Sequence, residues 1–190
     1  MNYEEVRREV DKYGTIHYYN KANQLHHIDG PAVELRNGTK SWYQNGKRHR
    51  LDGPAVERSY GYKEWWIDGN LHRLDGPAVE YSDGSKAWYQ NGEYHRLEGP
   101  AVEWSNGTRE WWQNGKRHRL EGPAYEEPSG YKEWWVDGKL HRLDGPAVEC
   151  IDGYKEWWID GKYYKTEKEW EKARCPSIEE AIKMFKGVNP

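Results

Sequence analysis

The chain has 190 residues, only 35% of them hydrophobic, and its aromatic residues are 12 Trp, 15 Tyr and a single Phe. A core of aliphatic side chains is therefore not expected, and burial has to come from indole and phenol rings. The formal net charge is -3, and the interleaved acidic and basic residues indicate neither a nucleic-acid nor a membrane partner. No apolar run reaches the length of a membrane span and no leader pattern opens the chain, so we expect a cytoplasmic protein.

A 23-residue repeat organises most of the sequence. Its core tripeptide, Gly-Pro-Ala, begins at Gly30, Gly53, Gly76, Gly99, Gly122 and Gly145. A Trp keeps the same period, at Trp42, Trp65, Trp88, Trp111, Trp134 and Trp157. A fixed period of this kind is typical of proteins in which copies of one supersecondary unit stack on their neighbours.

Residues 1–29 read as a degenerate first copy of the repeat. Val10 lies one period before its equivalent, whereas Gly14 and Tyr18 need a slip of one residue to match the later Gly and Trp columns. An atypical end repeat is expected because it caps the stack. The alternative is a short helix over Tyr3–Val10, whose apolar residues lie near helical spacing.

Residues 30–164 are predicted to hold six β-hairpin repeats. In one copy the first strand runs through Pro54–Glu57, a turn containing Gly follows, and Lys63–Trp66 forms the second strand. Asn45-Gly46, or Asp68-Gly69 in the next copy, then turns the chain toward the following His-Arg-Leu segment. Pro lacks an amide hydrogen and suits the first position of a strand, so each Gly-Pro marks the entry of a new hairpin.

The residue types of the first turn choose between two hairpin registers. A two-residue mirror-image turn needs positive φ at both central positions, which Tyr60 and Ser129 would resist. The same register would set Glu57 against Glu64. A three-residue loop leaves Gly alone in the left-handed conformation and pairs opposite charges, so we expect that loop. The predicted pairs are Glu34 with Lys40, Glu57 with Lys63, Glu80 with Lys86, Glu103 with Arg109, Glu126 with Lys132 and Glu149 with Lys155.

Both faces of the predicted sheet are aromatic. Adjacent residues of a strand point to opposite faces, so Trp65 and Trp66 lie on different sides. This favours a mainly β fold, a single-layer, twisted, antiparallel sheet of repeated hairpins, over a sandwich around one dry core.

Residues 165–190 are predicted to form a helical C-terminal cap. Thr166 and Glu169 make a capping box that opens a helix over Glu167–Arg174. Ser177 opens a second helix with one apolar stripe. We expect these two short helices to cover the last hairpin and protect its open edge.

The segment Asn114-Gly115-Lys116-Arg117-His118 and the Gly-containing strand after it resemble the MORN repeat, whose period is also 23. Tyr62 and Trp66 fall where MORN repeats carry Tyr and Trp, whereas Glu64 replaces the MORN Gly between them. The resemblance covers roughly residues 10–165 and is closest to the MORN-variant repeats of bacterial and viral proteins, including phage ones. It implies a MORN-like sheet but no particular activity, because such repeats are scaffolds with many uses.

The His column does not indicate an active site. Each His stands three residues before an acid, as His49 stands before Asp52, which in a single copy would suggest a proton-transfer pair or a metal site. Here the pattern repeats at about 9 to 10 Å per hairpin instead of converging on one pocket. We expect these His residues to bond turn backbone, and we expect no catalytic residue, metal or cofactor. Cys150 and Cys175 match no metal-ligand spacing and are expected as reduced thiols.

The basic columns do not indicate a nucleic-acid site. The columns from Lys40 to Lys155 and from Arg50 to Arg142 could follow a phosphate backbone, but the net acidity and the predicted Glu partners count against it. The Trp and Tyr ladders could stack on a nucleotide, a sugar or a cationic ligand. Packing of the rings against one another explains these ladders without a ligand.

Columns that vary between copies are the better candidates for a partner-binding site, because the constant columns build the scaffold. Trp, Tyr and Arg are the residue types that dominate binding hot spots. In the two most variable columns they are Arg48, Arg58, Tyr81, Tyr94, Trp104 and Arg117.

These patterns predict a non-enzymatic repeat scaffold that binds a protein, and they specify no oligomeric state. The resemblance to repeats common in phages implies a viral protein that binds and inhibits a host factor in the host cytoplasm. The alternative is an aromatic-lined protein that binds and sequesters a nucleotide or a carbohydrate. An enzyme ranks third.

Overall fold

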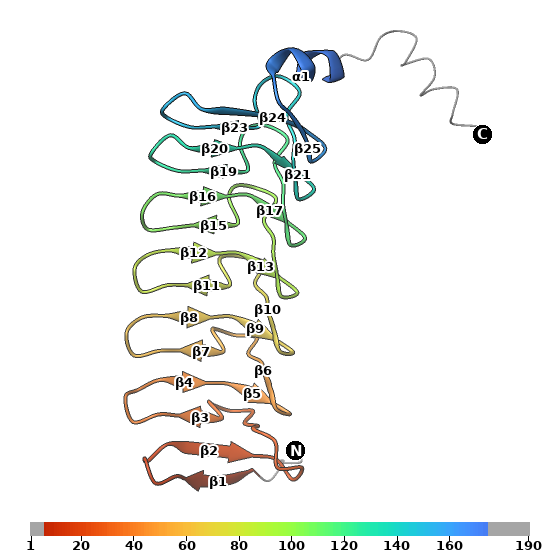
Figure 1. The fold of residues 1–190 in the computed structure, drawn as a ribbon. Helices are drawn as coiled ribbons and strands as arrows, with labels where there is room; N and C mark the ends of the chain where they lie inside the picture. Colours follow the sequence, from red (N-terminus) through yellow and green to blue (C-terminus); the bar gives the residue numbers. More distant parts are fainter. Residues whose placement is uncertain (1–5, 175–190) are drawn as a thin grey trace, which may run out of the picture. The chain divides into compact units, whose positions relative to one another are not determined.

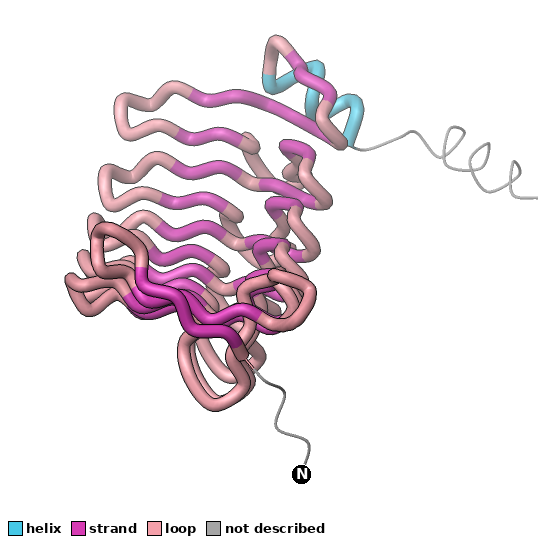
Figure 2. The backbone as a smooth tube through the Cα atoms, turned by 90° about the horizontal axis from the view of Figure 1, so that it is seen from below, coloured by secondary structure: helices cyan, strands magenta, loops and turns pink. Residues whose placement is uncertain are grey.

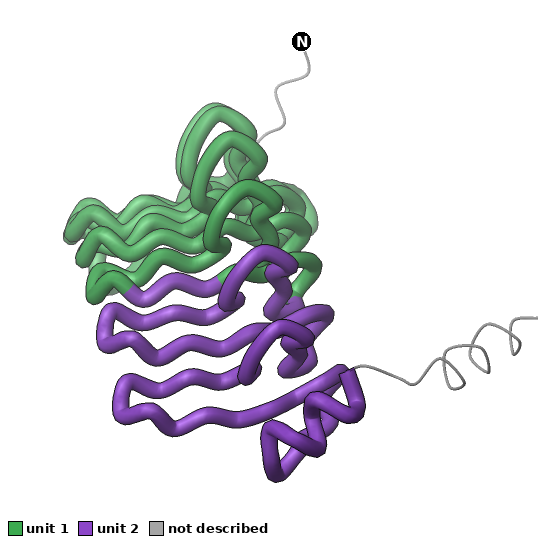
Figure 3. Tube along the Cα trace, turned by 90° about the horizontal axis from the view of Figure 1, so that it is seen from above, with its two compact units in different colours: residues 1–107, 111–115 green, residues 108–110, 116–190 purple. Residues whose placement is uncertain are grey.

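The structure is a computed structural model that describes residues 6–174. The chain divides into two compact units, shown in Figure 3. Unit 1 comprises residues 1–107 and 111–115, and unit 2 comprises residues 108–110 and 116–190. Both are mainly β and antiparallel, as the sequence predicts, and the one helix of the described residues lies in unit 2.

Unit 1 contains a row of main strands, each antiparallel to its neighbour (Figure 1). In spatial order they are β1 (Arg7–Val10), β2 (Ile16–Tyr19), β3 (Val33–Glu34), β4 (Lys40–Ser41), β7 (Val56–Glu57), β8 (Lys63–Glu64), β11 (Val79–Glu80), β12 (Lys86–Ala87) and β15 (Val102–Glu103). The corresponding row of unit 2 is β16 (Arg109–Glu110), β19 (Tyr125–Glu126), β20 (Lys132–Glu133), β23 (Val148–Glu149), β24 (Lys155–Ile159) and β25 (Lys162–Tyr164).

The repeats that begin at Gly30, Gly53, Gly76 and Gly122 also carry a second, smaller hairpin beside the main strands. In unit 1 these are β5 (Tyr43–Gln44) with β6 (Lys47–Arg48), β9 (Trp66–Ile67) with β10 (Asn70–Leu71), and β13 (Tyr89–Gln90) with β14 (Glu93–Tyr94). Unit 2 has β21 (Trp135–Val136) with β22 (Lys139–Leu140). Two further strands of this kind are β17 (Trp112–Gln113) in unit 1 and β18 (Lys116–Arg117) in unit 2.

The first turn of the repeat is the predicted three-residue loop. Arg58 N donates to Tyr62 O at 2.9 Å and Gly61 N donates to Arg58 O at 3.0 Å, with Gly61 at φ +93°. Left-handed backbone costs Gly little because it has no Cβ. The register is confirmed in five hairpins by the pairs Glu34 with Lys40, Glu57 with Lys63, Glu80 with Lys86, Glu126 with Lys132 and Glu149 with Lys155.

The second turn differs from the prediction, because it closes a hairpin of its own. Asn45 and Gly46 both have positive φ, 48° and 78°, and they join Gln44 to Lys47 as a two-residue turn. Asn and Asp tolerate the left-handed conformation, and followed by Gly they suit the mirror-image turn. The predicted strand Lys63–Trp66 is accordingly split between β8 and β9.

Trp65 is the residue at which the chain leaves the main sheet. Its N–H donates to Ala78 O at 2.8 Å, across to the next main strand, whereas its carbonyl accepts from His72 N at 3.0 Å, beyond the small hairpin. Its two backbone groups therefore bond in different hairpins, which ends β8 and starts β9.

The core is thin and made of small residues. The Ala of every Gly-Pro-Ala is fully buried, and the Val that follows it is buried in most copies. Ala78, for example, accepts a hydrogen bond from Trp65. A side chain larger than Ala finds no space at this position, which explains why this residue of the tripeptide is Ala in every copy.

The first hairpin, β1 with β2, follows the slip of one residue that the sequence indicates. Gly14 has φ +77° in a three-residue loop, and Tyr18 N donates to Ala32 O at 2.8 Å as Trp42 N does to Ala55 O. Residues Arg7–Val10 form a strand, so the alternative of a helix over this segment is wrong.

The helix α1 (Glu167–Arg174) has the predicted bounds and capping box. Glu169 N donates to Thr166 Oγ1, and Lys165 N donates to Glu169 Oε2. Trp170 is 3% exposed and packs against Trp157 with ring centroids 4.6 Å apart. The described residues hold this one helix and not two; the second predicted helix, from Ser177, lies outside them. Within residues 6–174 no helix is long and apolar enough to cross a membrane.

Candidate functional site

Alternate residues of the main strands define one side of the sheet, which we call the front face. In unit 1 it carries Tyr62, Glu64 and Trp66 from one repeat and Val79 and Tyr81 from the next. Trp65 points the other way and stacks with Arg73, whose Cζ lies 4.1 Å from the ring centroid. The predicted alternation of the two Trp columns is therefore present.

The structure brings the predicted site residues of unit 1 to this front face. Tyr81 and Trp104 contact each other, with ring centroids 6.2 Å apart, and Tyr62 lies edge-on to Tyr81 at 5.5 Å. Arg58 lies over Tyr62 at 4.9 Å. The three residues of this variable column that were predicted to bind a partner, Arg58, Tyr81 and Trp104, thus continue one aromatic surface.

The small hairpins add a second part to the same surface. Tyr94 packs against Tyr89 with ring centroids 4.3 Å apart and against Trp112 at 5.5 Å. Both Tyr residues, with Tyr81, surround the buried cluster of Val79, Ala87 and Val102. Tyr94 is therefore largely a packing residue, whereas Trp104 is 38% exposed and accessible to a partner.

The Glu column of the front face is held by neighbours on its own strand. Tyr62 donates its hydroxyl to Glu64, and Trp66 donates Nε1–H to the same carboxylate at 2.7 Å. Tyr154, Glu156 and Trp158 repeat the arrangement in unit 2, with distances of 2.8 Å for both bonds. The sequence Tyr-x-Glu-x-Trp thus builds a carboxylate that two side chains of the same segment, two residues before it and two residues after it, hold from both sides.

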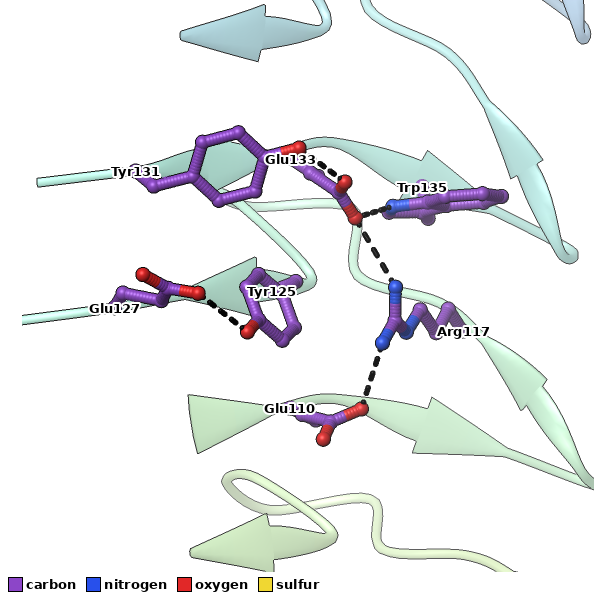
Figure 4. A network of polar contacts seen from close by, with 7 residues as sticks. All are labelled: Glu110, Arg117, Tyr125, Glu127, Tyr131, Glu133 and Trp135. Carbon is purple, nitrogen blue, oxygen red and sulfur yellow. Dashed lines mark hydrogen bonds and ion pairs between the residues drawn. The ribbon is translucent and has the colours of Figure 1, made fainter. Parts of the chain in front are cut away.

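Arg48 and Arg117, the remaining predicted site residues, neutralise these buried carboxylates. Arg117 donates Nη2–H to Glu110 at 3.0 Å and Nη1–H to Glu133 at 3.1 Å (Figure 4). In unit 1, Arg48 donates to Glu64 at 3.2 Å. Both guanidinium groups are paired with carboxylates of the protein itself, so Arg48 and Arg117 stabilise the fold and are weaker candidates for binding a partner.

The phenols of the front face are hydrogen-bond donors that stay protonated at neutral pH. Burial raises the pKa of Tyr62, Tyr89 and Tyr131, and the neighbouring carboxylates of Glu64 and Glu133 add to the effect on Tyr62 and Tyr131. Burial, and its hydrogen bond to Glu127, raise the pKa of Tyr125 to about 12. None of these phenols can act as a base near neutral pH.

The His column bonds turn backbone, as predicted, but in the next repeat. His49 Nδ1 accepts from Asp68 N at 3.2 Å and lies 2.9 Å from Asp68 Oδ1, so its partner is 19 residues away and is not Asp52. The same contact joins His72 to Asn91 and His141 to Asp160. Each His therefore ties the loop that leads into the next Gly-Pro to the Asn-Gly or Asp-Gly turn of the following copy.

Asp52 bonds to Arg50 instead. Arg50 Nε lies 3.0 Å from Asp52 Oδ1, and its Nη1 donates to Pro54 O and Glu57 Oε1 at 3.1 and 2.8 Å. The guanidinium also stacks over Trp42 at 4.0 Å. The hydrogen bond from Arg50 lowers the pKa of Asp52. One Arg thus holds the whole Leu-Asp-Gly-Pro loop closed.

These contacts leave the polar columns occupied by structural bonds. Within residues 6–174 no group of three or more His, Cys, Asp or Glu could hold a metal ion. Cys150 is a free thiol whose pKa is raised by desolvation.

Sequence reasoning missed one surface, the Leu of each His-Arg-Leu segment. In unit 1 these are Leu51, Leu74 and Leu97, which are 79%, 76% and 73% exposed, and Ile28 at the equivalent position after His26-His27 is 60% exposed. They form a constant column, and we assigned constant columns to the scaffold. The signal that could have revealed them is that Leu follows Arg in a short polar loop, where no element covers it.

A scan against protein-family models finds no match for this chain, and a search of curated proteins finds none either. The β-hairpin repeat is therefore established by the structure, and membership of the MORN family stays a prediction.

Proposed function

We propose that this protein is a non-enzymatic scaffold that binds another protein through the front face of its sheet. The observation that carries the proposal is the Tyr81–Trp104 surface of unit 1, an aromatic patch that is partly exposed and flanked by Arg58. Aromatic and Arg side chains of this kind supply most of the binding energy in protein interfaces.

The variable columns support this surface over the constant ones. Where unit 1 has Arg58, Tyr81 and Trp104, the same column in unit 2 has Glu127, which accepts from the Tyr125 hydroxyl at 2.7 Å. The fold therefore accepts a basic, an aromatic and an acidic residue at this position. Because the fold does not require a particular residue type at this position, the residue type can serve recognition of a partner.

The polar groups offer little support for a catalytic function. The Glu, His and Arg columns are bonded to neighbours in every repeat described above, so a reacting group would have to break scaffold bonds. The resemblance to repeats of phage proteins extends the proposal to a viral protein that inhibits a host factor, with the host cytoplasm as its location.

Affinity capture with the purified full-length chain, followed by mass spectrometry, tests this proposal. Tyr81→Ala and Trp104→Ala should each weaken retention of the captured partner at least tenfold, whereas Tyr13→Ala, an exposed aromatic in the loop of the first hairpin, should leave it unchanged. Equal retention by all three variants would refute the front face as the binding site.

The second candidate, a small-ligand binder, is tested by the thermal shift of the full chain with nucleotides and glycans. The contacts between Tyr89 and Tyr94 argue against it, because rings that already pack on each other leave no slot for a stacked ligand. A shift that saturates with one of these ligands and disappears in Trp104→Ala would replace the protein-binding proposal.

A further inference from the structure

We propose that the return loops of unit 1 form a second docking surface, separate from the front face, for an amphipathic α-helix of another protein. The helix would carry an apolar residue at every seventh position and basic residues beside them. A return loop is the segment between a small hairpin and the next main strand, and Figure 2 shows these loops projecting to one side of the strands. We call Ile28, Leu51, Leu74 and Leu97 the Leu row.

The Leu row is exposed although its loops do not need it for their shape. Leu51 and Leu74 are 79% and 76% exposed. The loop around Leu51 is closed by Arg50, through its bonds to Asp52 and to Pro54 O. An apolar side chain that contributes nothing to the fold, in a chain that is polar elsewhere, marks an interaction surface.

Clefts between consecutive loops give the Leu row its shape. One cleft lies between the loops of Ile28 and Leu51, with Trp42 and Gln44 in its lining. Another lies between the loops of Leu74 and Leu97, lined in the same way by Trp88 and Gln90. Each is a hollow with an apolar side chain on both flanks and an indole in its wall, which suits an inserted apolar side chain.

The spacing of the loops fits an α-helix better than a β-strand. Two strands separate consecutive loops, so equivalent side chains repeat at about 9.6 Å. Residues seven apart in an α-helix are about 10.5 Å apart along its axis, and a tilt of about 24° brings this to the same value. Side chains on one side of an extended strand repeat at about 6.8 Å, which does not match.

The acidic residues beside the Leu row determine which charge the partner helix should carry. Every return loop of unit 1 carries one acid, namely Asp29, Asp52, Asp75 or Glu98. The Asp52 and Asp75 side chains are 84% and 85% exposed, whereas their Arg50 and Arg73 partners are 21% and 22% exposed and also pair with a Glu. The charge presented to solvent beside the Leu row is therefore negative, and Lys or Arg residues on the partner helix would complement it.

Unit 2 shows how a helix contacts such a loop. Trp170 of α1 donates Nε1–H to Arg142 O, and Arg174 donates Nη1–H to Leu143 O, both at 3.0 Å. Leu143 is 48% exposed, against 77% for Leu120 in the preceding loop of the same unit. An aromatic and a basic residue four apart on a helix thus meet the carbonyl groups of His-Arg-Leu, and the same chemistry is available to a partner at the loops of unit 1.

The test uses the full chain and a synthetic, fluorescein-labelled helical peptide with Leu at every seventh position and Lys at the flanking positions. A scrambled peptide of the same composition is the control, and binding is measured by fluorescence anisotropy. We expect the heptad peptide to bind at least tenfold more tightly than the scrambled one. The triple variant Leu51→Gln, Leu74→Gln and Leu97→Gln should lose that difference, whereas Ile151→Gln, an exposed apolar residue of unit 2, should keep it.

Three outcomes would overturn the inference. The first is the absence of the expected difference. Either the heptad and scrambled peptides bind the wild-type chain equally, or the triple variant binds the heptad peptide as tightly as the wild type while its circular dichroism spectrum is unchanged. A second is binding only after residues 175–190 are deleted, which would assign the row to the chain's own C-terminal segment. The third is a wild-type dimer that the triple variant converts to a monomer in sedimentation, which would assign it to a second copy. Trp104→Ala changes the front face and leaves the Leu row intact. This variant should therefore bind the heptad peptide as the wild type does, which distinguishes the Leu row from the front face.

Discussion

Arg117→Leu should be the most destabilising single substitution on the front face of unit 2. Arg117 donates to Glu110 and Glu133, whose side chains are only 11% and 16% exposed, and it is itself 26% exposed. Leu occupies the same column at Leu71 and Leu140, so the new side chain fits the scaffold. What the variant loses is the charge between the two carboxylates.

The size of the loss follows from those contacts. A hydrogen bond to a charged group contributes about 1.5 to 3 kcal/mol, and removal of one partner of a fully buried ion pair costs about 3 to 5 kcal/mol. Partial exposure lets water reach both carboxylates, and Glu133 keeps its bonds from Tyr131 and Trp135. We therefore expect the free energy of unfolding to fall by about 2 to 4 kcal/mol.

Urea unfolding followed by Trp fluorescence measures this loss, with Arg48→Leu as the matched control. Arg48 bonds to one buried carboxylate, Glu64, and should cost about half as much. A loss for Arg117→Leu that does not exceed the loss for Arg48→Leu, or that stays under about 0.5 kcal/mol, would refute the bridging role. In the double variant Arg117→Leu and Glu110→Ala, part of the loss should return, because one of the two carboxylates that lost the Arg117 charge is gone.

Three further predictions concern the turns, the phenols and the helix. Gly61→Ala should lower the free energy of unfolding by about 1 to 2 kcal/mol in urea titration, because φ is +93° while no atom lies within 4 Å of the added Cβ. The Tyr125 pKa of about 12 exceeds the unfolded value of about 10, so its contribution to stability should be complete below pH about 10 and lost as the pH rises to about 12. Absorbance titration at alkaline pH measures the ionisation, and Tyr125→Phe should remove that part of the pH dependence. Trp170→Ala should lower the free energy of unfolding by about 3 kcal/mol and increase hydrogen exchange in α1 and in the hairpin of Trp157, because Trp170 is 3% exposed and packs against Trp157.

The main hairpins could be predicted because the sequence repeats without slippage from Gly30 onward. Turn chemistry at Tyr60-Gly61 and the charges of Glu57 and Lys63 were enough to choose the register, and α1 followed from its capping box. The small hairpins were missed because their strands are two residues long. At that length no alternation of apolar and polar residues can develop, although Asn45-Gly46 is a strong hairpin signal.

The candidate site was predictable in part. Arg58, Tyr81 and Trp104 lie on one surface because one period separates them at equivalent positions of successive copies, which a single sequence can reveal. Comparison of adjacent copies could have suggested the role of Arg117, since Glu stands in the flanking column on both sides of it, whereas Arg48 has Ser41 on one side. The comparison gives no general rule, because Leu140 also stands between two Glu residues. The partner of His49 could not have been predicted, because the turn it bonds is 19 residues away and only the structure places the two side by side.

The bond from each His to the turn of the following copy also bears on how such a chain can change its length. His49 meets Asp68 as His72 meets Asn91, so every junction within unit 1 accepts any copy as its successor. An in-frame duplication or deletion of one 23-residue segment would create a junction of a kind already present. Recombination between copies can therefore lengthen or shorten the protein, and with it the number of exposed Leu side chains, without inventing a new contact.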